Sequence, residues 1–170
     1  MRELFDEELE LTSLGRKVAL TLVGIYILCL CFLCFSPQPF NIDGVETPNI
    51  IYYGRLRLLL VPFNSLVGIG QLDSVFEVFW VFAQNVTNIF LIFPLMLGLI
   101  WIFPKLRQWM RAWLLAFGIS LTIETTQLLV DLLYNANRVF EIDDLWTNSL
   151  GGLLALWLYS AIYQKFHFHK

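Results

Sequence analysis

Four long apolar stretches, separated by short polar segments, dominate the pattern of residues along this chain. Each is close to the roughly 20 residues that an α-helix needs to cross the ~30 Å hydrocarbon core of a bilayer. We therefore predict an all-α membrane protein with four transmembrane helices in one domain, 16–163, flanked by polar tails at 1–15 and 164–170. The predicted helices cover approximately residues 16–36, 85–103, 111–134 and 143–163.

The first apolar stretch has an alternative interpretation as a cleaved signal peptide. It is longer than a typical signal core, and no small-x-small cleavage site follows it. Pro37 and Pro39 follow instead, as expected at the end of a helix. We interpret this stretch as the first membrane crossing, and we expect the acidic segment before it to be a solvated tail with at most one loose helical turn.

The region between the first two crossings is harder to assign. Residues 36–72 are expected to form a long loop in which Arg55 and Arg57 lie beside tyrosines at the membrane interface. The apolar run that follows would be about 46 Å long as one helix, which exceeds the bilayer core. We expect two pieces: an interfacial segment, Asp73–Ala83, and a crossing that is bent by Pro94.

Composition supports a membrane protein and excludes several functions. Hydrophobic residues make up 58% and charged residues 15% of the chain, whereas soluble domains are about 25% charged. There is no basic patch, so no nucleic-acid partner is expected. The cysteines, at 29, 31 and 34, all lie in the first apolar stretch and predict neither a disulfide framework nor a metal site. His167 and His169 near the end are interpreted as interfacial anchors, and no cofactor is expected.

The distribution of Lys and Arg predicts the orientation in the membrane, because cytoplasmic loops are enriched in these residues. With four crossings, both termini fall on the side with more cations and are predicted to be cytoplasmic. That side would carry Arg2, Arg16, Lys17, Lys105, Arg107, Arg111, Lys165 and Lys170, against Arg55, Arg57 and Arg138 on the outer side.

Two of the apolar stretches carry polar residues at helical spacing. Along one face of the third predicted helix lie Ser120, Glu124, Gln127 and Asp131, which are four, three and four residues apart. The fourth helix repeats this spacing with Asp144, Asn148, Gly151 and Ala155. Because a short loop joins these helices, the two polar stripes could face each other.

Glu124 is the most unusual of these residues because it would lie about 15 Å below the outer end of its helix. A charge at the membrane centre costs about 2.5–3.5 kcal/mol on insertion scales. One interpretation is a neutral acid that joins helices by hydrogen bonding to Gln127 or Ser120. The other is a functional group, which is the usual role of an ionisable side chain within the membrane.

The start of the fourth helix adds further polar groups. Asp143 and Asp144 could simply cap the helix, although one aspartate would be enough for this role. Arg138 is the nearest cation and the expected counter-ion. Gly151 and Gly152 would allow a neighbouring helix to approach closely.

These residues predict an outward-facing polar pocket among the helices. Zinc and acyl-enzyme chemistry are disfavoured because no histidine, cysteine or serine–base pair is present. Carboxylates with amide oxygens could hold Mg²⁺, with Asp143 and Asp144 as weak candidates, or bind a cationic or hydroxyl-rich ligand. The predicted ligand-binding residues are Asn88, Ser120, Glu124, Gln127, Arg138, Glu141, Asp143, Asp144 and Asn148.

From Asn88 to Tyr163 the chain resembles the VanZ family of small bacterial membrane proteins. Three blocks carry the resemblance: Asn88 with Pro94; Ser120 with Glu124 and Gln127; and Arg138, Glu141, Asp143, Asp144, Asn148, Gly151 and Gly152. Glu141, Met96 and Leu59 stand where the family usually has Asp, Gly and Asn. The resemblance implies a plasma-membrane protein linked to low-level resistance to teicoplanin-type lipoglycopeptide antibiotics.

Three functions are consistent with the sequence. The leading hypothesis is a protein that binds an amphiphile, either the antibiotic or an envelope lipid or polymer, together with membrane lipids. The second is an enzyme acting on lipid-linked envelope material, with Glu124 as general acid/base and Asp143 and Asp144 orienting the substrate or a metal. The third is a small proton-coupled transporter in which Glu124 relays protons.

Overall fold

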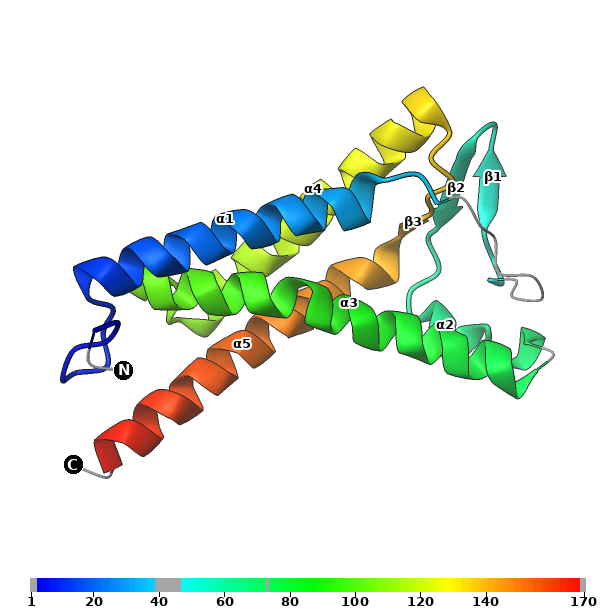
Figure 1. Cartoon of the computed structure of the whole chain (residues 1–170). Coiled ribbons are helices and arrows are strands. Elements are labelled where there is room, and N and C mark those ends of the chain that lie inside the picture. Colours follow the sequence, from blue (N-terminus) through cyan, green and yellow to red (C-terminus); the bar gives the residue numbers. More distant parts are fainter. Residues whose placement is uncertain (1–2, 39–46, 73, 169–170) are drawn as a thin grey trace.

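The computed structural model describes residues 3–38, 47–72 and 74–168, and is mostly helical (Figure 1). Arg2, Pro39, Asp73, His169 and Lys170, which enter the sequence predictions, lie outside these ranges. The long helices are α1 (Ser13–Phe35), α3 (Val75–Ile102), α4 (Trp109–Tyr134) and α5 (Ile142–Phe168). In the described part of the chain, three of them, α1, α3 and α4, are long and apolar enough to cross a membrane.

Helix α5 corresponds to the predicted fourth crossing, but it is not among these three. It has 27 residues, and its first turns carry Asp143, Asp144 and Asn148, which lower its hydropathy. It is instead the most enclosed of the long helices, because it packs against α3 on one side and α4 on the other. Helix α1 packs mainly on α3 and contacts α4 only sparsely.

Helix α3 corrects the prediction of two separate pieces. It runs without a break for 28 residues, with Pro94 inside it, so Asp73–Ala83 is not a separate interfacial segment. The Ser74 side chain accepts a hydrogen bond from the Glu77 N–H at 3.2 Å and caps the start of the helix. No glycine or proline interrupts the sequence between this cap and Pro94, so the helix continues across the predicted boundary.

The predicted first loop also contains unpredicted structure. A short three-stranded sheet combines β1 (Ile51–Tyr53), β2 (Leu56–Leu59) and β3 (Phe140–Glu141), so the fold is not entirely α-helical. Strand β2 pairs in parallel with β3, which brings the first loop against the segment that precedes α5. The short helices are α2 (Asn64–Val67) and the 3₁₀ turns η1 (Ile69–Gln71) and η2 (Pro104–Leu106).

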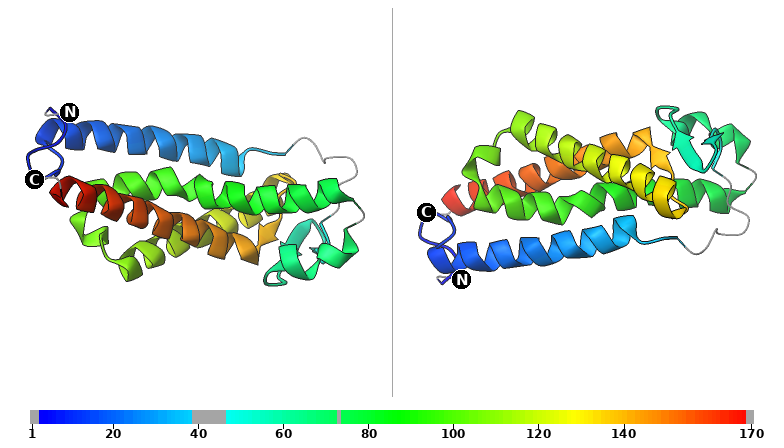
Figure 2. Two further views of the ribbon diagram at one scale, coloured as in Figure 1. Left: turned by 90° about the horizontal axis from the view of Figure 1, so that it is seen from below. Right: turned by 90° about the horizontal axis from the view of Figure 1, so that it is seen from above.

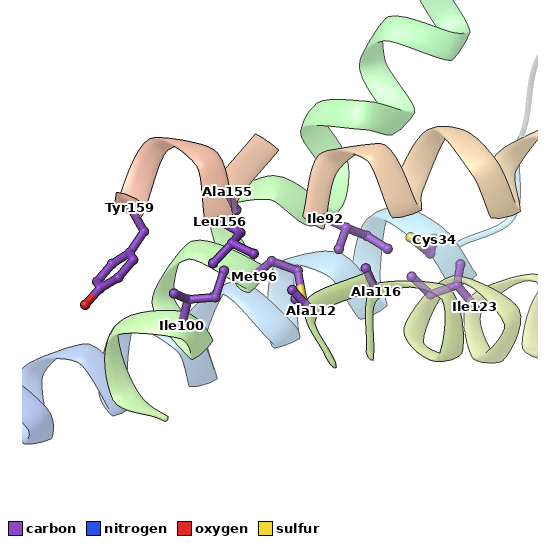
Figure 3. Packing of buried hydrophobic residues seen from close by; sticks show 10 residues of the cluster. All are labelled: Cys34, Ile92, Met96, Ile100, Ala112, Ala116, Ile123, Ala155, Leu156 and Tyr159. Carbon is purple, nitrogen blue, oxygen red and sulfur yellow. The ribbon is translucent and has the colours of Figure 1, made fainter. Parts of the chain in front are cut away.

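The two ends of the helix bundle differ. One end, which we call the sheet end, carries the strands and α2 (Figure 1). The start of α1 and the end of α5 lie together at the opposite end (Figure 2). Between the ends, residues of α1, α3, α4 and α5 form one buried cluster with Cys34 and Ile123 towards one side and Tyr159 at the other (Figure 3).

Gly151 and Gly152 lie where α5 meets its neighbours. A Cβ atom added to Gly152 would come within 2.5 Å of the Ala116 Cβ in α4. One added to Gly151 would overlap the Ile89 carbonyl oxygen of α3. Both positions therefore require glycine for the helices to approach this closely.

The N-terminal segment is folded, which corrects the prediction of a solvated tail. Phe5 and Leu11 form an isolated antiparallel bridge. The Glu10 carboxylate forms a bidentate ion pair with Arg107, whose guanidinium lies 4.8 Å from the centre of the Tyr159 ring. Hydrogen bonding to Glu10 raises the pKa of Arg107. This contact could not be read from the tail alone, because its partner is 97 residues away.

Candidate functional site

A cavity of about 1230 Å³ lies at the sheet end, between the long helices and the first loop. Side chains from α1, α3, α4, α5, β2 and β3 line it. Ser120 does not line it, but it is buried and hydrogen-bonded to Asn148, which does. The cavity does include the other predicted ligand-binding residues: Asn88, Glu124, Gln127, Arg138, Glu141, Asp143, Asp144 and Asn148.

A chain of hydrogen bonds joins α3, α4 and α5 beside the cavity. Asn88 Nδ2 donates to Asp144 Oδ1 at 2.6 Å, and Ser120 Oγ donates to the Asp144 carbonyl oxygen at 3.0 Å. Asn148 Nδ2 donates to Ser120 Oγ at 2.9 Å. Asn148 is only 1% exposed, and its Oδ1 has no hydrogen-bond partner among the described residues. An unpaired buried amide oxygen is costly, so this atom is a strong acceptor for a ligand donor.

Glu124, which is 1% exposed, meets other partners than those predicted from the sequence. Its Oε2 accepts the Glu141 backbone N–H at 3.1 Å, and its carboxyl group lies close to that of Asp144. Two buried carboxyl groups this close repel each other if both are ionised. The predicted partner Gln127 instead donates to the Cys34 carbonyl oxygen of α1 at 3.0 Å.

Glu141, in β3, adds a third carboxyl group to this cluster. Burial and, after it, the negative charges of Asp144 and Asp143 raise the pKa of Glu141 to about 8. Glu141 therefore favours its neutral form at neutral pH. A positively charged or hydrogen-bond-donating ligand would stabilise its ionised form.

Asp143 has a different environment from its neighbour Asp144. Its two carboxylate oxygens accept the backbone N–H groups of Phe63 at 2.7 Å and Asn64 at 2.8 Å. These bonds hold the loop at the start of α2, where Phe63 has a left-handed φ of 54°. Both oxygens of Asp143 thus hold the first loop, and the weak prediction of Mg²⁺ at Asp143 and Asp144 stays a prediction. Within the described ranges, no group of three His, Cys, Asp or Glu side chains is placed to hold a metal ion.

Arg138 is not the counter-ion that the sequence predicts. Its Nη2 donates to the carbonyl oxygens of Leu33 and Ser36, both at 2.7 Å, and so satisfies the C-terminal end of α1. Its backbone N–H donates to Asp131 at 3.2 Å. Burial lowers the pKa of Arg138. The reason for the difference is that the chain entering α5 runs past the end of α1, whose free carbonyl groups attract the guanidinium.

Sequence reasoning missed the contribution of the first loop to the cavity. Arg57, whose role the sequence left open, lines the cavity, whereas Arg55 is exposed and does not. Asn64 also lines it, together with Trp80 from the part of α3 that was predicted to be interfacial and Gln84 just after that part. Strand β2 has only four residues, three half-buried and one buried, and shows no alternation that would reveal a strand by periodicity, so no local signal identified these residues.

Comparison with known proteins gives one match. The model of the family described as VanZ/LLP1 matches residues 23–163, which is most of the chain and includes every cavity residue predicted from the sequence. No curated protein and no solved structure matches the chain.

Proposed function

The chain belongs to the VanZ/LLP1 family, and on this premise we propose that it binds the polar head of an amphiphile in the cavity at the sheet end. The amphiphile is a lipoglycopeptide antibiotic of the teicoplanin type or an envelope lipid or polymer. The family resemblance supports the antibiotic, and the chemistry of the cavity is compatible with either.

The observation that carries this proposal is the excess of hydrogen-bond acceptors in a cavity enclosed by apolar helices. Glu124, Glu141 and Asp144 gather there, and the buried Asn148 oxygen lacks a partner in the described part of the chain. Arg138 directs its guanidinium to backbone carbonyl groups instead of these acids. Amines and hydroxyl groups are the donors that such a set of acceptors recognises. Ionisable groups in a membrane protein interior typically mark a ligand site.

The proposed topology places the sheet end outside the cell. The bundle then crosses the bacterial plasma membrane four times, with α5 enclosed by its neighbours as the fourth crossing. The start of α1 and the end of α5 lie at the same end of the bundle (Figures 1 and 2). Lys105, Arg107 and Arg111 lie in or next to the turn between α3 and α4, which supports a cytoplasmic location for that turn.

The test is teicoplanin binding to the purified protein in phospholipid nanodiscs. Glu124→Gln removes one acid and should weaken binding roughly tenfold or more, as expected for losing a hydrogen bond to a charged group. Asp131→Asn is the matched control: Asp131 is a buried carboxylate on the same helix, but it does not line the cavity. Equal binding by the wild type and Glu124→Gln would refute the proposal.

The neighbouring carboxyl groups of Glu124 and Asp144 in the cavity favour a second candidate, an enzyme acting on lipid-linked envelope material. A pair of acids that shares one proton can act as general acid and base. In this case Glu124→Gln would abolish turnover of a lipid-linked envelope substrate by the purified protein. A protein that binds teicoplanin but converts no such substrate would leave binding as the function.

A further inference from the structure

A second cavity, of about 500 Å³, opens between α1 and α4. Its lining is almost entirely apolar, and we call it the apolar groove. Thr122 is its one hydroxyl-bearing residue, and that hydroxyl donates to the Gly118 carbonyl oxygen within α4. The groove is lined by Ile27, Leu30, Cys31, Phe35, Leu95, Leu99, Leu114, Leu115, Gly118, Ile119, Thr122 and Ile123.

The apolar groove continues directly from the polar cavity. Ile123 lines both of them. On α3, Leu91 lines the cavity, whereas Leu95 and Leu99 line the groove one and two turns further along. From Leu91 to Leu99 the helix advances about 12 Å. The α1 residue Cys34 lies beside Ile123 in Figure 3, where the two cavities meet.

The way in which α1 is held explains why the groove remains open. At the sheet end, Gln127 and Arg138 bind its last carbonyl groups. Further along, α1 approaches α3 closely, since a Cβ on Gly98 would come within 2.6 Å of Val23. The Tyr26 hydroxyl also donates to the Leu91 carbonyl oxygen at 2.8 Å. Helix α1 is therefore attached to α3 and to the sheet end, and among the described residues no comparable contact closes the space between α1 and the middle of α4.

We propose that the apolar groove holds the hydrocarbon chain of the same amphiphile whose polar head lies in the cavity. This inference rests on the proposed function and specifies its ligand as a head group with a chain that leaves the cavity between α1 and α4. Acyl chains of the bilayer are as apolar as the groove, so the groove adds little hydrophobic driving force. Its effect is geometric: the chain stays in apolar surroundings while the head reaches Glu124 and Asp144, without disturbing the packed core.

Gly118 allows the groove to be blocked without disturbing the fold. Gly118 lines the groove, and a Cβ there would meet no atom within 4 Å, so a side chain at this position starts in open space and Gly118→Leu narrows the groove. Gly24 is equally free of neighbours, lies on α1 and lines neither cavity, so Gly24→Leu is the matched control. Thr122→Leu is a second way to narrow the groove, which guards against a folding defect peculiar to one variant.

The experiment compares teicoplanin with the same antibiotic after removal of its acyl chain, using the protein in phospholipid nanodiscs. Because the acyl chain also inserts into the nanodisc lipid, the acylated form should bind more tightly in every variant. Gly118→Leu and Thr122→Leu should weaken its binding at least tenfold, because the chain can no longer leave the cavity through the groove, and the binding of the deacylated form should not change. Gly24→Leu should resemble the wild type. If both forms bind equally, or Gly118→Leu has no effect, the groove is not the chain site, although the proposed function stands. If neither form binds, the proposed function and this inference both fail.

A second measurement locates the chain. Teicoplanin carrying a diazirine at the end of its acyl chain should label Cys31, which lines the groove, in preference to Cys29, which is also exposed on α1 but does not. Gly118→Leu should abolish this preference, and unmodified teicoplanin should compete for labelling. Equal labelling of Cys29 and Cys31 would mean that the chain lies in the bulk lipid, and would overturn the inference.

Discussion

The two ends of this membrane protein differ in how their ionisable side chains are arranged. At the end where α1 begins, Glu10 and Arg107 form an ion pair, and the Arg107 guanidinium lies over the Tyr159 ring. At the sheet end, Glu124, Glu141 and Asp144 gather around a cavity, and the nearby Arg138 is engaged by backbone carbonyl groups. The paired charges join segments of the chain, whereas the clustered carboxyl groups line a cavity that we propose as a ligand site. The comparison therefore distinguishes residues with a structural role from residues of the proposed site.

The largest expected effect comes from the helix contact that holds the two ends together. Gly151→Leu would force a side chain into the Ile89 carbonyl group of α3. We expect destabilisation of about 3 kcal/mol or more, at the upper end of the range for overpacking, with loss of the monodisperse protein on gel filtration in detergent. Gly70→Leu, at a position with no neighbour within 4 Å of a Cβ, is the control. A normally folded Gly151→Leu protein would show that α3 and α5 can separate freely.

Asp143→Ala should have the next largest effect. It leaves the N–H groups of Phe63 and Asn64 without their carboxylate, and hydrogen bonds to charged groups are worth about 1.5–3 kcal/mol each. The melting temperature should fall clearly, and proteolysis of the first loop should become faster. The melting temperature of Asp143→Asn, which keeps one acceptor oxygen, should fall less than that of Asp143→Ala. If Asp143→Ala melted like the wild type, the sheet end would not depend on this link.

The pH dependence of stability should come from the sheet end. The folded-state pKa of Glu141 is about 8, above its ordinary value of 4.5, so the folded protein binds a proton more readily than the unfolded chain. The stabilisation is complete below pH 4.5 and is lost as the pH rises towards 8. Glu141→Gln, which remains neutral, should flatten the melting temperature between pH 5 and 8. If the melting temperature of the wild type and of Glu141→Gln changed equally with pH, the pH dependence would come from another group.

The smallest effect is expected at the opposite end. Glu10→Gln breaks the ion pair with Arg107, and the two side chains are 34% and 18% exposed. Partly exposed pairs contribute at most about 1 kcal/mol, and salt screens them. The loss of stability should therefore be small and should disappear in high salt. A large, salt-independent loss would mean that this contact is as essential as the packing around Gly151.

The residues of the polar cavity that could be predicted from the sequence share one property: they repeat at helical spacing. Glu124 and Gln127 on α4, and Asp144 and Asn148 on α5, stand out because each pair interrupts an apolar helix. Arg57 could not be found in this way, because its strand has four residues and gains its position from pairing with a segment about 80 residues later.

The wrong predictions have a common physical cause as well. The role of Arg138 and the folded N-terminal segment both depend on partners that are distant in sequence, at 102 and 97 residues. The break predicted in α3 relied on the thickness of a bilayer, but the chain contains no residue that would end the helix there. The local sequence pattern predicted the helices, whereas contacts with residues distant in sequence determined which groups bind at the helix ends.

The most direct test of the central claim compares the neighbouring residues Asp143 and Asp144. We predict that Asp144→Asn lowers the affinity for teicoplanin at least tenfold while the melting temperature stays the same or rises, because a member of a cluster of acids has been neutralised. Asp143→Asn should lower the melting temperature instead. An Asp144→Asn protein that binds teicoplanin with wild-type affinity would contradict the account.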